Sequence, residues 1–299
     1  AQFFFLDGGK ILGDDFDNFK SKYNEKSSDY IESLHELKTT IAKHSIRRCK
    51  NDVLELPEKR FINVYVDLNG KQLELYNKLR NELKIEVQDI DGNISIDEAE
   101  NILKKLLRLT QIASNPSLID KGYNEIPAKF EKLDNLLKDI ASKDEKAIIW
   151  TCFVENITIL KKRLREYNPL VIHGEIPIKD RMNFVNIFQE SDKNKVMIAN
   201  PAAAREGLTL TKANNAIYLD RNFNLVDYLQ SQDRIHRISQ TKECNIYKIL
   251  ARNTIDEYID RLIDVKRDIA GYVQDDFEFL ETGSYEFLSN RQELLRILG

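Results

Sequence analysis

From position 126 onward, short continuous apolar runs alternate with segments whose apolar residues recur at helical spacing. The continuous runs predict buried strands over residues 146–153, 169–174, 195–201, 214–220 and 244–251. The intervening segments predict helices over residues 156–167, 178–190, a stretch that begins near Leu225, and 255–273. Buried strands joined by helices imply an α/β fold, in which helices cover both faces of a parallel sheet.

The first 125 residues follow a different, mostly helical pattern. Phe16, Phe19 and Tyr23 lie at helical spacing, and a further helix ends near the basic cluster of Arg47, Arg48 and Lys50. Those cations contact DNA, dock on the α/β domain, or only complete a helix C-terminus, and the sequence leaves all three readings open. Later segments predict a strand over residues 61–68 and helices over residues 71–87 and 97–113.

Two arginines, Arg234 and Arg237, lie three residues apart in the segment QSQDRIHRISQ, residues 230–240. Leu225, Leu229 and His236 fall at helical spacing, so we expect a helix that points both guanidinium groups to one side. Two planar cations aimed together suit a transferring phosphoryl group, whose transition state spreads negative charge over three oxygens. The alternative is an ordinary surface helix with charges at i and i+3.

Composition narrows the classes of protein further. The chain has 299 residues and a net charge of −4, so it is not a basic nucleic-acid binder by composition, although a local basic stripe would still bind phosphate. Three scattered cysteines indicate neither a disulfide framework nor a zinc site. No apolar run approaches membrane-spanning length and no secretory signal is evident, so we expect no membrane contact and a cytoplasmic or nuclear location. The abrupt apolar opening AQFFFLDGG suggests a fragment of a longer chain.

Several segments, taken in order, carry a family resemblance. They are IRRCKNDVLELPEK, LLRLTQIASNPSLI, KAIIWTCFVENITIL, VIHG, AAAREGLTLTKANNAIYLD, QSQDRIHRISQ and ARNTIDEYIDRLIDVK. This set resembles the C-terminal RecA-like lobe of the Swi/Snf family of superfamily 2 ATPases, which translocate on DNA. Ala204, Arg205, Thr209 and Ser239 depart from the residues usual in the family's fifth and sixth motifs, and Asn115 stands where histidine is common.

The resemblance implies an organisation in three parts and a role in ATP hydrolysis. A helical linker and protrusion region would span residues 1–125, the second RecA-like lobe 126–265, and a helical brace 266–299. Arg234 and Arg237 would act on ATP held by a first lobe. Nucleotide-binding residues would be Gly207, Gln230 and Asp233. No G-x-x-x-x-G-K-S/T phosphate loop occurs in the chain, so we expect ATP and its magnesium ligands on that first lobe and no hydrolysis by this chain alone.

The resemblance also implies a grip on one strand of double-stranded DNA. The residues expected to contact phosphates without reading sequence are Thr151, His173, Gly174, Arg181 and Thr209. Other interpretations are simpler: Arg181 is a solvated surface charge, Gly207 forms a tight turn without a ligand, and His236 is a packed core histidine instead of a relay.

Two segments near residue 90 resemble metal-binding motifs, but we do not expect either to bind a metal ion. DEAE, residues 97–100, lies at a polar helix start between linker elements, where a magnesium-binding acidic motif is not expected. Asp89, Asp91 and Gly92 match positions of a calcium-binding loop, but Val87 stands where the first carboxylate ligand belongs. We therefore interpret this region as a helix-hairpin turn, and we predict no metal ligands in the chain.

The leading hypothesis is the second motor lobe of an ATP-dependent double-stranded DNA translocase. One alternative is a superfamily 2 helicase of another branch, which would separate strands. A second is a non-catalytic module that binds nucleic acid or protein and keeps the lobe only as a scaffold. Retention of both arginines argues against the scaffold, because a scaffold has no use for them.

Overall fold

The structure is a computed structural model that describes residues 10–13, 15–24, 29–46, 54–89, 96–273, 295 and 298. The chain divides into two compact units. The smaller contains residues 1–53 and 262–293, and the larger contains residues 54–261 and 294–299. Within the described residues, no helix has both the length and the apolar content needed to cross a membrane.

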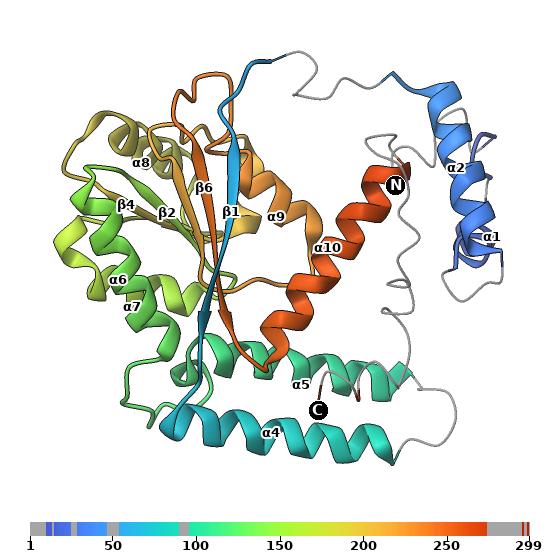
Figure 1. Cartoon of the computed structure of the whole chain (residues 1–299), viewed down its shortest axis with the longest axis horizontal. Coiled ribbons are helices and arrows are strands. Elements are labelled where there is room, and N and C mark those ends of the chain that lie inside the picture. Colours follow the sequence, from blue (N-terminus) through green and yellow to red (C-terminus); the bar gives the residue numbers. More distant parts are fainter. Residues whose placement is uncertain are drawn as a thin grey trace. The chain divides into compact units, whose positions relative to one another are not determined.

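A single parallel sheet forms the centre of the larger unit (Figure 1). Its strands are β1 (Lys59–Val66), β2 (Ala147–Trp150), β3 (Leu170–Ile172), β4 (Val196–Ala199), β5 (Asn215–Tyr218) and β6 (Cys244–Ala251). They lie in the order β1-β6-β5-β2-β4-β3, and every neighbouring pair is parallel. The expected α/β fold is confirmed.

Helices cover both faces of this sheet. They are α6 (Ala128–Ser142), α7 (Val154–Arg163), α8 (Ile178–Glu190) and α9 (Leu225–Gln232). Right-handed crossovers place α6 and α7 on one face and α8 and α9 on the other. Figure 1 shows α6 and α7 together on the side of the sheet away from α9. Short 3₁₀ turns, η2 (Pro116–Leu118), η3 (Arg165–Tyr167) and η4 (Pro201–Glu206), complete the connections.

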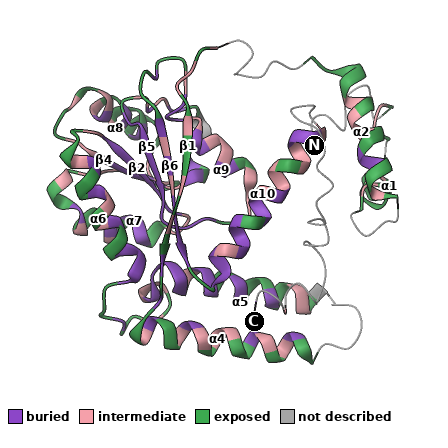
Figure 2. Cartoon of the chain, in the orientation of Figure 1, coloured by how far each residue is buried: buried purple, intermediate pink, exposed green. Residues whose placement is uncertain are grey.

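The core of the larger unit lies between these layers. Strands β2, β4 and β5 are buried along their whole length (Figure 2). Trp150 at the end of β2 stacks on Tyr218 of β5, with ring centroids 6.4 Å apart, and Tyr218 meets Tyr228 of α9 edge-on at 4.8 Å. Burial on both faces explains why these strands are continuous apolar runs in the sequence.

Strand β1 comes from the region that we expected to be a linker. It adds to the sheet beside β6, with Lys59 opposite Cys244 and Val66 opposite Ala251. One strand of the sheet therefore comes from before residue 125, where we expected the boundary between the helical region and the α/β domain. The three-part division of the chain remains a prediction.

Two long helices, α4 (Gly70–Gln88) and α5 (Ile96–Ser114), follow β1. Leu83 and Val87 of α4 are fully buried. The helices confirm two predicted helices, but Asp91 and Gly92 between them lie outside the described residues. The basic cluster of Arg47, Arg48 and Lys50 lies outside them as well.

The smaller unit contains α1 (Phe16–Lys22), α2 (Tyr30–His44) and the second part of α10 (Ile255–Val273). Its first two helices bury little: α1 buries none of its residues, and α2 buries Ser33 and Leu34. In α10, by contrast, Leu262, Ile263 and Tyr272 are buried. The hydroxyl of Tyr272 on α10 lies 2.9 Å from His35 Nδ1. Of the residues after 273, the structure describes only Leu295 and Leu298, so the expected C-terminal brace lies mostly outside it.

Candidate functional site

The two arginines lie on a loop instead of a helix. Helix α9 ends at Gln232, and residues 233–240, here called the arginine loop, form successive turns. The helical prediction for this stretch was wrong. The helical spacing of Leu225, Leu229 and His236 continues past Gln232 in the sequence. The backbone nevertheless leaves the helix, because the carbonyl of Arg234 accepts the N–H of Leu210 from a separate segment at 2.9 Å.

Arg237 is held at three points. Its Nε donates to the carbonyl of Asp233 at 3.1 Å, and its Nη1 donates to the carbonyl of Gly207 at 3.1 Å and to Thr209 Oγ1 at 2.9 Å. The side chain is half-buried. A long arginine that would otherwise sample many rotamers therefore has one orientation before any ligand arrives.

Arg234 is buried beside it. Only 5% of Arg234 is exposed, and its Nε has no hydrogen-bond acceptor among the described residues. Burial lowers the pKa of Arg234, and the nearby charge of Arg237 lowers it further, while Asp233 offsets part of the effect. An unpaired N–H on a buried cation beside a second cation fits an anionic oxygen, such as one of a nucleotide phosphate.

The segment from Gly207 to Ala213 is tied to the arginine loop along its length. The Gln240 amide donates to the carbonyls of Thr211 (3.1 Å), Ala213 (2.9 Å) and Ile235 (3.0 Å). Ser239, which departs from the family's glycine, places its hydroxyl 2.8 Å from that of Thr211. The two segments therefore form one bonded unit.

Gly207 begins that segment with a φ of +78°, in the left-handed region that favours glycine. A Cβ built at this position meets no atom within 4 Å. Glycine is thus required by the turn at the end of η4, and no close approach of another group requires it. The turn aims the Gly207 carbonyl at Arg237.

The predicted nucleotide and nucleic-acid residues lie at opposite edges of the sheet. The arginine loop leads into β6, and the Gly207 segment leads into β5, so both lie at the amino-terminal edge. Thr151 and His173 follow β2 and β3 at the carboxyl edge, where parallel α/β sheets generally bind their ligands. Thr209, predicted on the nucleic-acid side, instead contacts Arg237. Because the strands are parallel, the connection from β4 to β5 must return to the amino-terminal edge.

At the carboxyl edge, Asp220 organises a buried polar cluster. It accepts hydrogen bonds from Ser114 Oγ (2.7 Å), Thr151 Oγ1 (2.7 Å), the Cys152 N–H (2.6 Å) and Asn156 Nδ2 (3.3 Å). Burial raises the pKa of this carboxyl, and Lys129 and the Cys152 N–H oppose the rise. Thr151 is fully buried, so its side chain has no exposed atom with which to reach a nucleic-acid strand. Its hydroxyl donates to Asp220 and accepts the Phe153 N–H at 3.3 Å.

The turn after β3 has an exposed Gly174 and a half-buried His173. Arg181 is 6% exposed and donates from Nε to the Ile176 carbonyl (2.6 Å) and from Nη2 to the Gly174 carbonyl (2.8 Å). Neither sequence interpretation of Arg181, a phosphate contact or a solvated charge, matches this position. The guanidinium faces inward and shapes the turn that carries Gly174.

Sequence reasoning missed the partner of Asp233. Its carboxylate pairs with Lys59 Nζ at 3.2 Å, at the start of β1, so it is already engaged without nucleotide. No sequence signal joined these residues, which lie 174 positions apart. Gln230, the remaining predicted nucleotide residue, is half-buried on α9.

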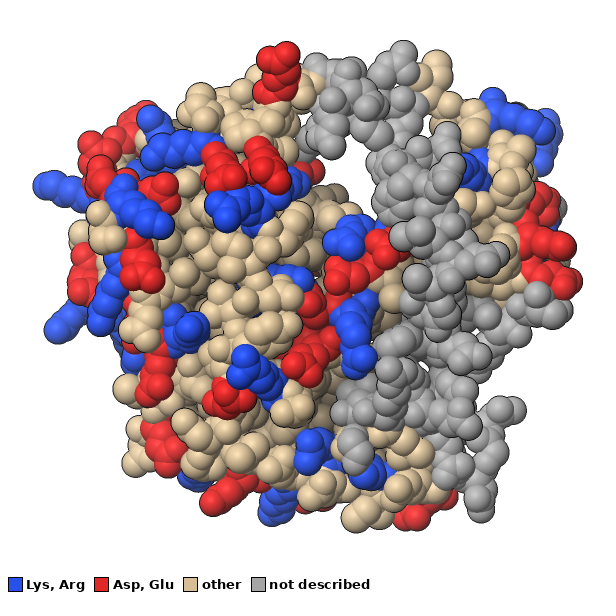
Figure 3. Space-filling model, viewed as in Figure 1, with Lys and Arg blue, Asp and Glu red and all other residues tan. Residues whose placement is uncertain are grey.

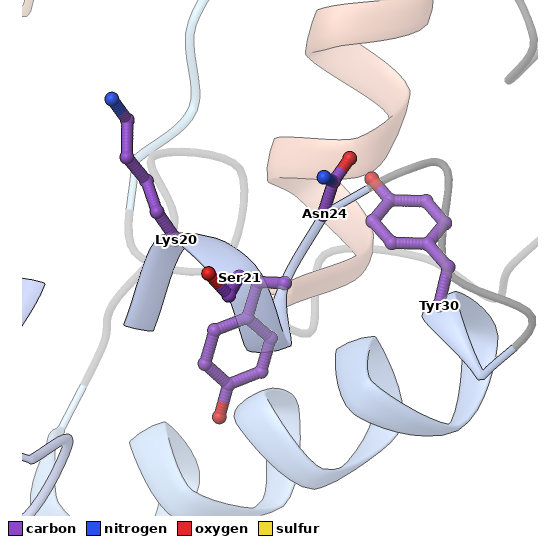
Figure 4. Close-up of a pocket in the computed structure, with 5 residues that line it drawn as sticks. Lys20, Ser21, Asn24 and Tyr30 are labelled. Carbon is purple, nitrogen blue, oxygen red and sulfur yellow. The ribbon is translucent and has the colours of Figure 1, made fainter. Parts of the chain in front are cut away.

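Other potential sites are sparse within the described parts of the chain. They contain no group of three or more His, Cys, Asp or Glu able to hold a metal ion. Lysine and arginine are interspersed with acidic side chains on the face shown in Figure 3. A pocket of about 460 Å³ in the smaller unit is lined by Lys20, Ser21, Tyr23, Asn24 and Tyr30 (Figure 4), none of which was predicted as a site residue.

Comparison with protein families gives two matches. Residues 128–239 match the helicase conserved C-terminal domain, and residues 5–118 match the SNF2-related domain. Together the two matches cover most of the chain. The first contains Arg234, Arg237 and the turn after β3, residues 173–176.

Curated relatives are similar over most of this chain. An uncharacterized ATP-dependent helicase of Mycoplasma genitalium is 29% identical over 274 residues, 90% of this chain and 26% of the relative. A putative ATP-dependent helicase/translocase of Bacillus subtilis is 28% identical, over 79% of this chain and 26% of the relative. The ATPase of the ISWI chromatin-remodeling complex of Saccharomyces cerevisiae is 27% identical, over 82% and 23%. The chain spans about a quarter of the length of these relatives.

Solved structures extend the likeness. The Sulfolobus solfataricus SWI2/SNF2 ATPase core in complex with dsDNA has a TM-score of 0.63 and 28% identity, over 97% of this chain and 61% of that one. The C-terminal domain of the same ATPase, at 24% identity and a TM-score of 0.61, shares the fold over 80% of this chain and 98% of that domain. The RecA-like character of the sheet, expected from the sequence, is confirmed.

Proposed function

Because this chain belongs to the Swi/Snf family of superfamily 2 ATPases, we propose that it is the second motor lobe of an ATP-dependent translocase on double-stranded DNA. The lobe that it contains is the C-terminal, RecA-like lobe of that family. One observation carries the proposal. Arg234 and Arg237 lie on a single loop, one with a buried unpaired Nε and the other already oriented by three acceptors.

The two arginines stabilise the negative charge on the phosphoryl group as it is transferred in the transition state. ATP supplies that group and is held by a first lobe, together with magnesium. Arg237 is fixed by its three bonds, so little rearrangement is needed when the lobes close, and arginines in such positions raise rates by about 10³-fold or more. Arg234, buried beside Arg237, adds positive charge on this side of the cleft. Hydrolysis would therefore depend on closure of the lobes.

The carboxyl edge grips the DNA backbone. The turn from His173 to Ile176 is closed by the Ile176 N–H bonding to the His173 carbonyl, its exposed Gly174 offers backbone to a phosphate, and Arg181 holds its shape from inside. Contacts of this kind fix register on a strand and carry no sequence information. The similar Sulfolobus core was solved with dsDNA, which supports a duplex as the substrate. Thr151 acts on this edge from within, through its bond to Asp220.

Gln230 and Gly207 complete the proposed nucleotide side. Gly207 contributes by aiming its carbonyl at Arg237. Gln230, on the last turn of α9, is near enough in sequence to the loop to bond nucleotide or an arginine when the lobes close.

The test is steady-state ATP hydrolysis by the protein extended to include its first lobe, with and without duplex DNA. Arg237→Ala is expected to abolish the stimulation by duplex, with a loss of about 10³-fold in kcat. Arg252→Ala is the control, because Arg252 is exposed and pairs with Asp67 away from the loop. Stimulation by DNA that survives in Arg237→Ala would remove the arginine from the mechanism.

The same assay separates the competing functions. Unwinding of a labelled duplex would favour a helicase of another branch, whereas displacement of a bound third strand without unwinding supports translocation. No hydrolysis under any condition would leave the non-catalytic module.

A further inference from the structure

The segment of residues 57–59 enters the larger unit directly beside the arginine loop. The carbonyl of Pro57 accepts His236 Nε2 at 2.8 Å, and Lys59 Nζ lies 3.2 Å from Asp233 Oδ1. Between them, the carbonyl of Glu58 accepts the N–H of Cys244 at 2.9 Å, where β6 begins. Every residue of this short segment therefore bonds to the arginine loop or to the strand that follows it.

Asp233 connects this segment to Arg237. Its carboxylate pairs with Lys59, and its backbone carbonyl accepts Arg237 Nε at 3.1 Å. His236, immediately before Arg237, is 6% exposed and is held by Pro57. A displacement of residues 57–59 would consequently move Asp233, whose carbonyl holds Arg237, and His236, which directly precedes Arg237.

The Lys59–Asp233 pair is poorly suited to a purely stabilising role. The side chains of Lys59 and Asp233 are 24% and 38% exposed, and ion pairs this accessible to water contribute little to stability. The salt bridge can instead set an orientation. It fixes the carboxylate of Asp233, and the backbone carbonyl of the same residue holds Arg237.

We propose that Lys59 and His236 are positioning residues, which hold Arg237 in its working orientation through Asp233 and Pro57. The chain passes from the smaller to the larger unit just before this segment, between residues 53 and 54. Residues 57–59 belong to the larger unit, so the contacts that hold the arginine loop all lie within it. This inference rests on the proposed function, and it assigns Asp233 to the loop's support instead of to nucleotide binding.

The experiment measures kcat and KM for ATP at saturating duplex DNA, in the protein that includes the first lobe. Lys59→Met is expected to lower kcat by about tenfold and to leave KM within about twofold, because Arg237 acts in the transition state and not in ground-state binding. Arg60→Met is the matched control. It removes a pair of similar length, Arg60 to Glu243 at 3.1 Å, from the same strand without touching the arginine loop.

An exchange of charges makes the test specific. Combining Lys59→Asp with Asp233→Lys restores the pair in reverse and is expected to recover most of kcat. If Asp233 instead binds nucleotide, the exchange leaves kcat low and raises KM, which overturns the proposal. A kcat for Lys59→Met equal to that of Arg60→Met overturns it as well.

His236 provides an independent arm should Lys59→Met fail to fold. His236→Gln keeps a donor within reach of the Pro57 carbonyl and is expected to retain most of kcat. His236→Ala removes that donor and is expected to lower kcat. Equal losses in both variants contradict a positioning role. Absence of hydrolysis in the unaltered protein would instead overturn the proposed function itself.

Discussion

Asp260 shows how a single buried carboxylate is stabilised by its neighbours. Lys248 Nζ lies 2.7 Å and 3.0 Å from its two oxygens, and Arg221 lies 2.7 Å from Oδ1. Burial alone would raise the pKa of Asp260, but the two cations outweigh it and hold that pKa below the ordinary 3.8. The charged form is therefore favoured in the folded state.

This shift predicts how the effect of Asp260→Asn depends on pH. A lowered folded pKa contributes stability that is present above the unfolded pKa and is lost as pH falls through the folded value. The free energy of unfolding of the variant should thus lie below that of the unaltered chain from pH 7 to about pH 5, and the gap should close below about pH 4. Urea unfolding at a series of pH values measures it.

The control for this prediction is Asp67→Asn. Asp67 pairs with Arg252 at the surface, with side chains 72% and 51% exposed, so the substitution should change the free energy of unfolding by less than about 1 kcal/mol. A gap for Asp260→Asn that widens as pH falls would contradict the assigned sign.

Residue types at the site were predictable, but their exposure was not. The sequence picked out Arg234 and Arg237, yet it could not show that Thr151 is fully buried. Thr151 follows an apolar strand, a position where loops often bind ligands, and only the distant Asp220 turns its hydroxyl inward. Contacts between residues far apart in the chain decide such cases, and no local pattern records them.

At the scale of elements, Gln72 joins three helices. Its Nε2 donates to the carbonyls of Ile112 (2.8 Å) and Ala113 (3.3 Å) at the end of α5, and its Oε1 accepts the N–H of Ala128 at the start of α6. Gln72 itself lies in the first turn of α4 and is fully buried. One side chain thereby satisfies backbone groups at two helix termini.

Gln72→Leu keeps the volume of the side chain and removes those bonds. We expect it to lower the free energy of unfolding by about 2–4 kcal/mol, because three buried backbone groups lose their partner. Asn81→Leu, at an exposed position of the same helix, should change it by less than about 0.5 kcal/mol. Urea unfolding of both variants measures the difference, and equal effects would mean that the Gln72 bonds contribute nothing.

Most elements were predictable because their burial is periodic. Strands β2 to β6 and helices α4, α5, α7, α8 and α10 all appear where apolar spacing placed them. Helix α6 was overlooked, although Phe130, Leu133, Leu137 and Ile140 carry the spacing of an amphipathic helix. The end of α9 could not be predicted, since the bond between Leu210 and Arg234 that interrupts it joins two separate segments.

At the scale of the whole molecule, the two units differ in how much they bury. The smaller unit's α1 buries none of its residues, whereas the larger unit surrounds a sheet whose central strands are fully buried. Units with such different cores are not expected to unfold together.

Calorimetry of this chain should therefore show two thermal transitions, the first from the smaller unit. Leu34→Ala, in α2, should lower the first transition, and Leu133→Ala, in α6, should lower the second, because each removes a buried side chain from one core only. One transition shifted equally by both substitutions would contradict independent unfolding.

The stacked pair at the end of β2 has an optical consequence. Trp150 is the only tryptophan of the chain, it is wholly screened from water, and Tyr218 lies 6.4 Å away. Its fluorescence should therefore be blue-shifted and should be excited in part by energy transfer from Tyr218. Because Trp150 directly precedes Thr151, its emission is an intrinsic, label-free signal of events at the carboxyl edge of the sheet.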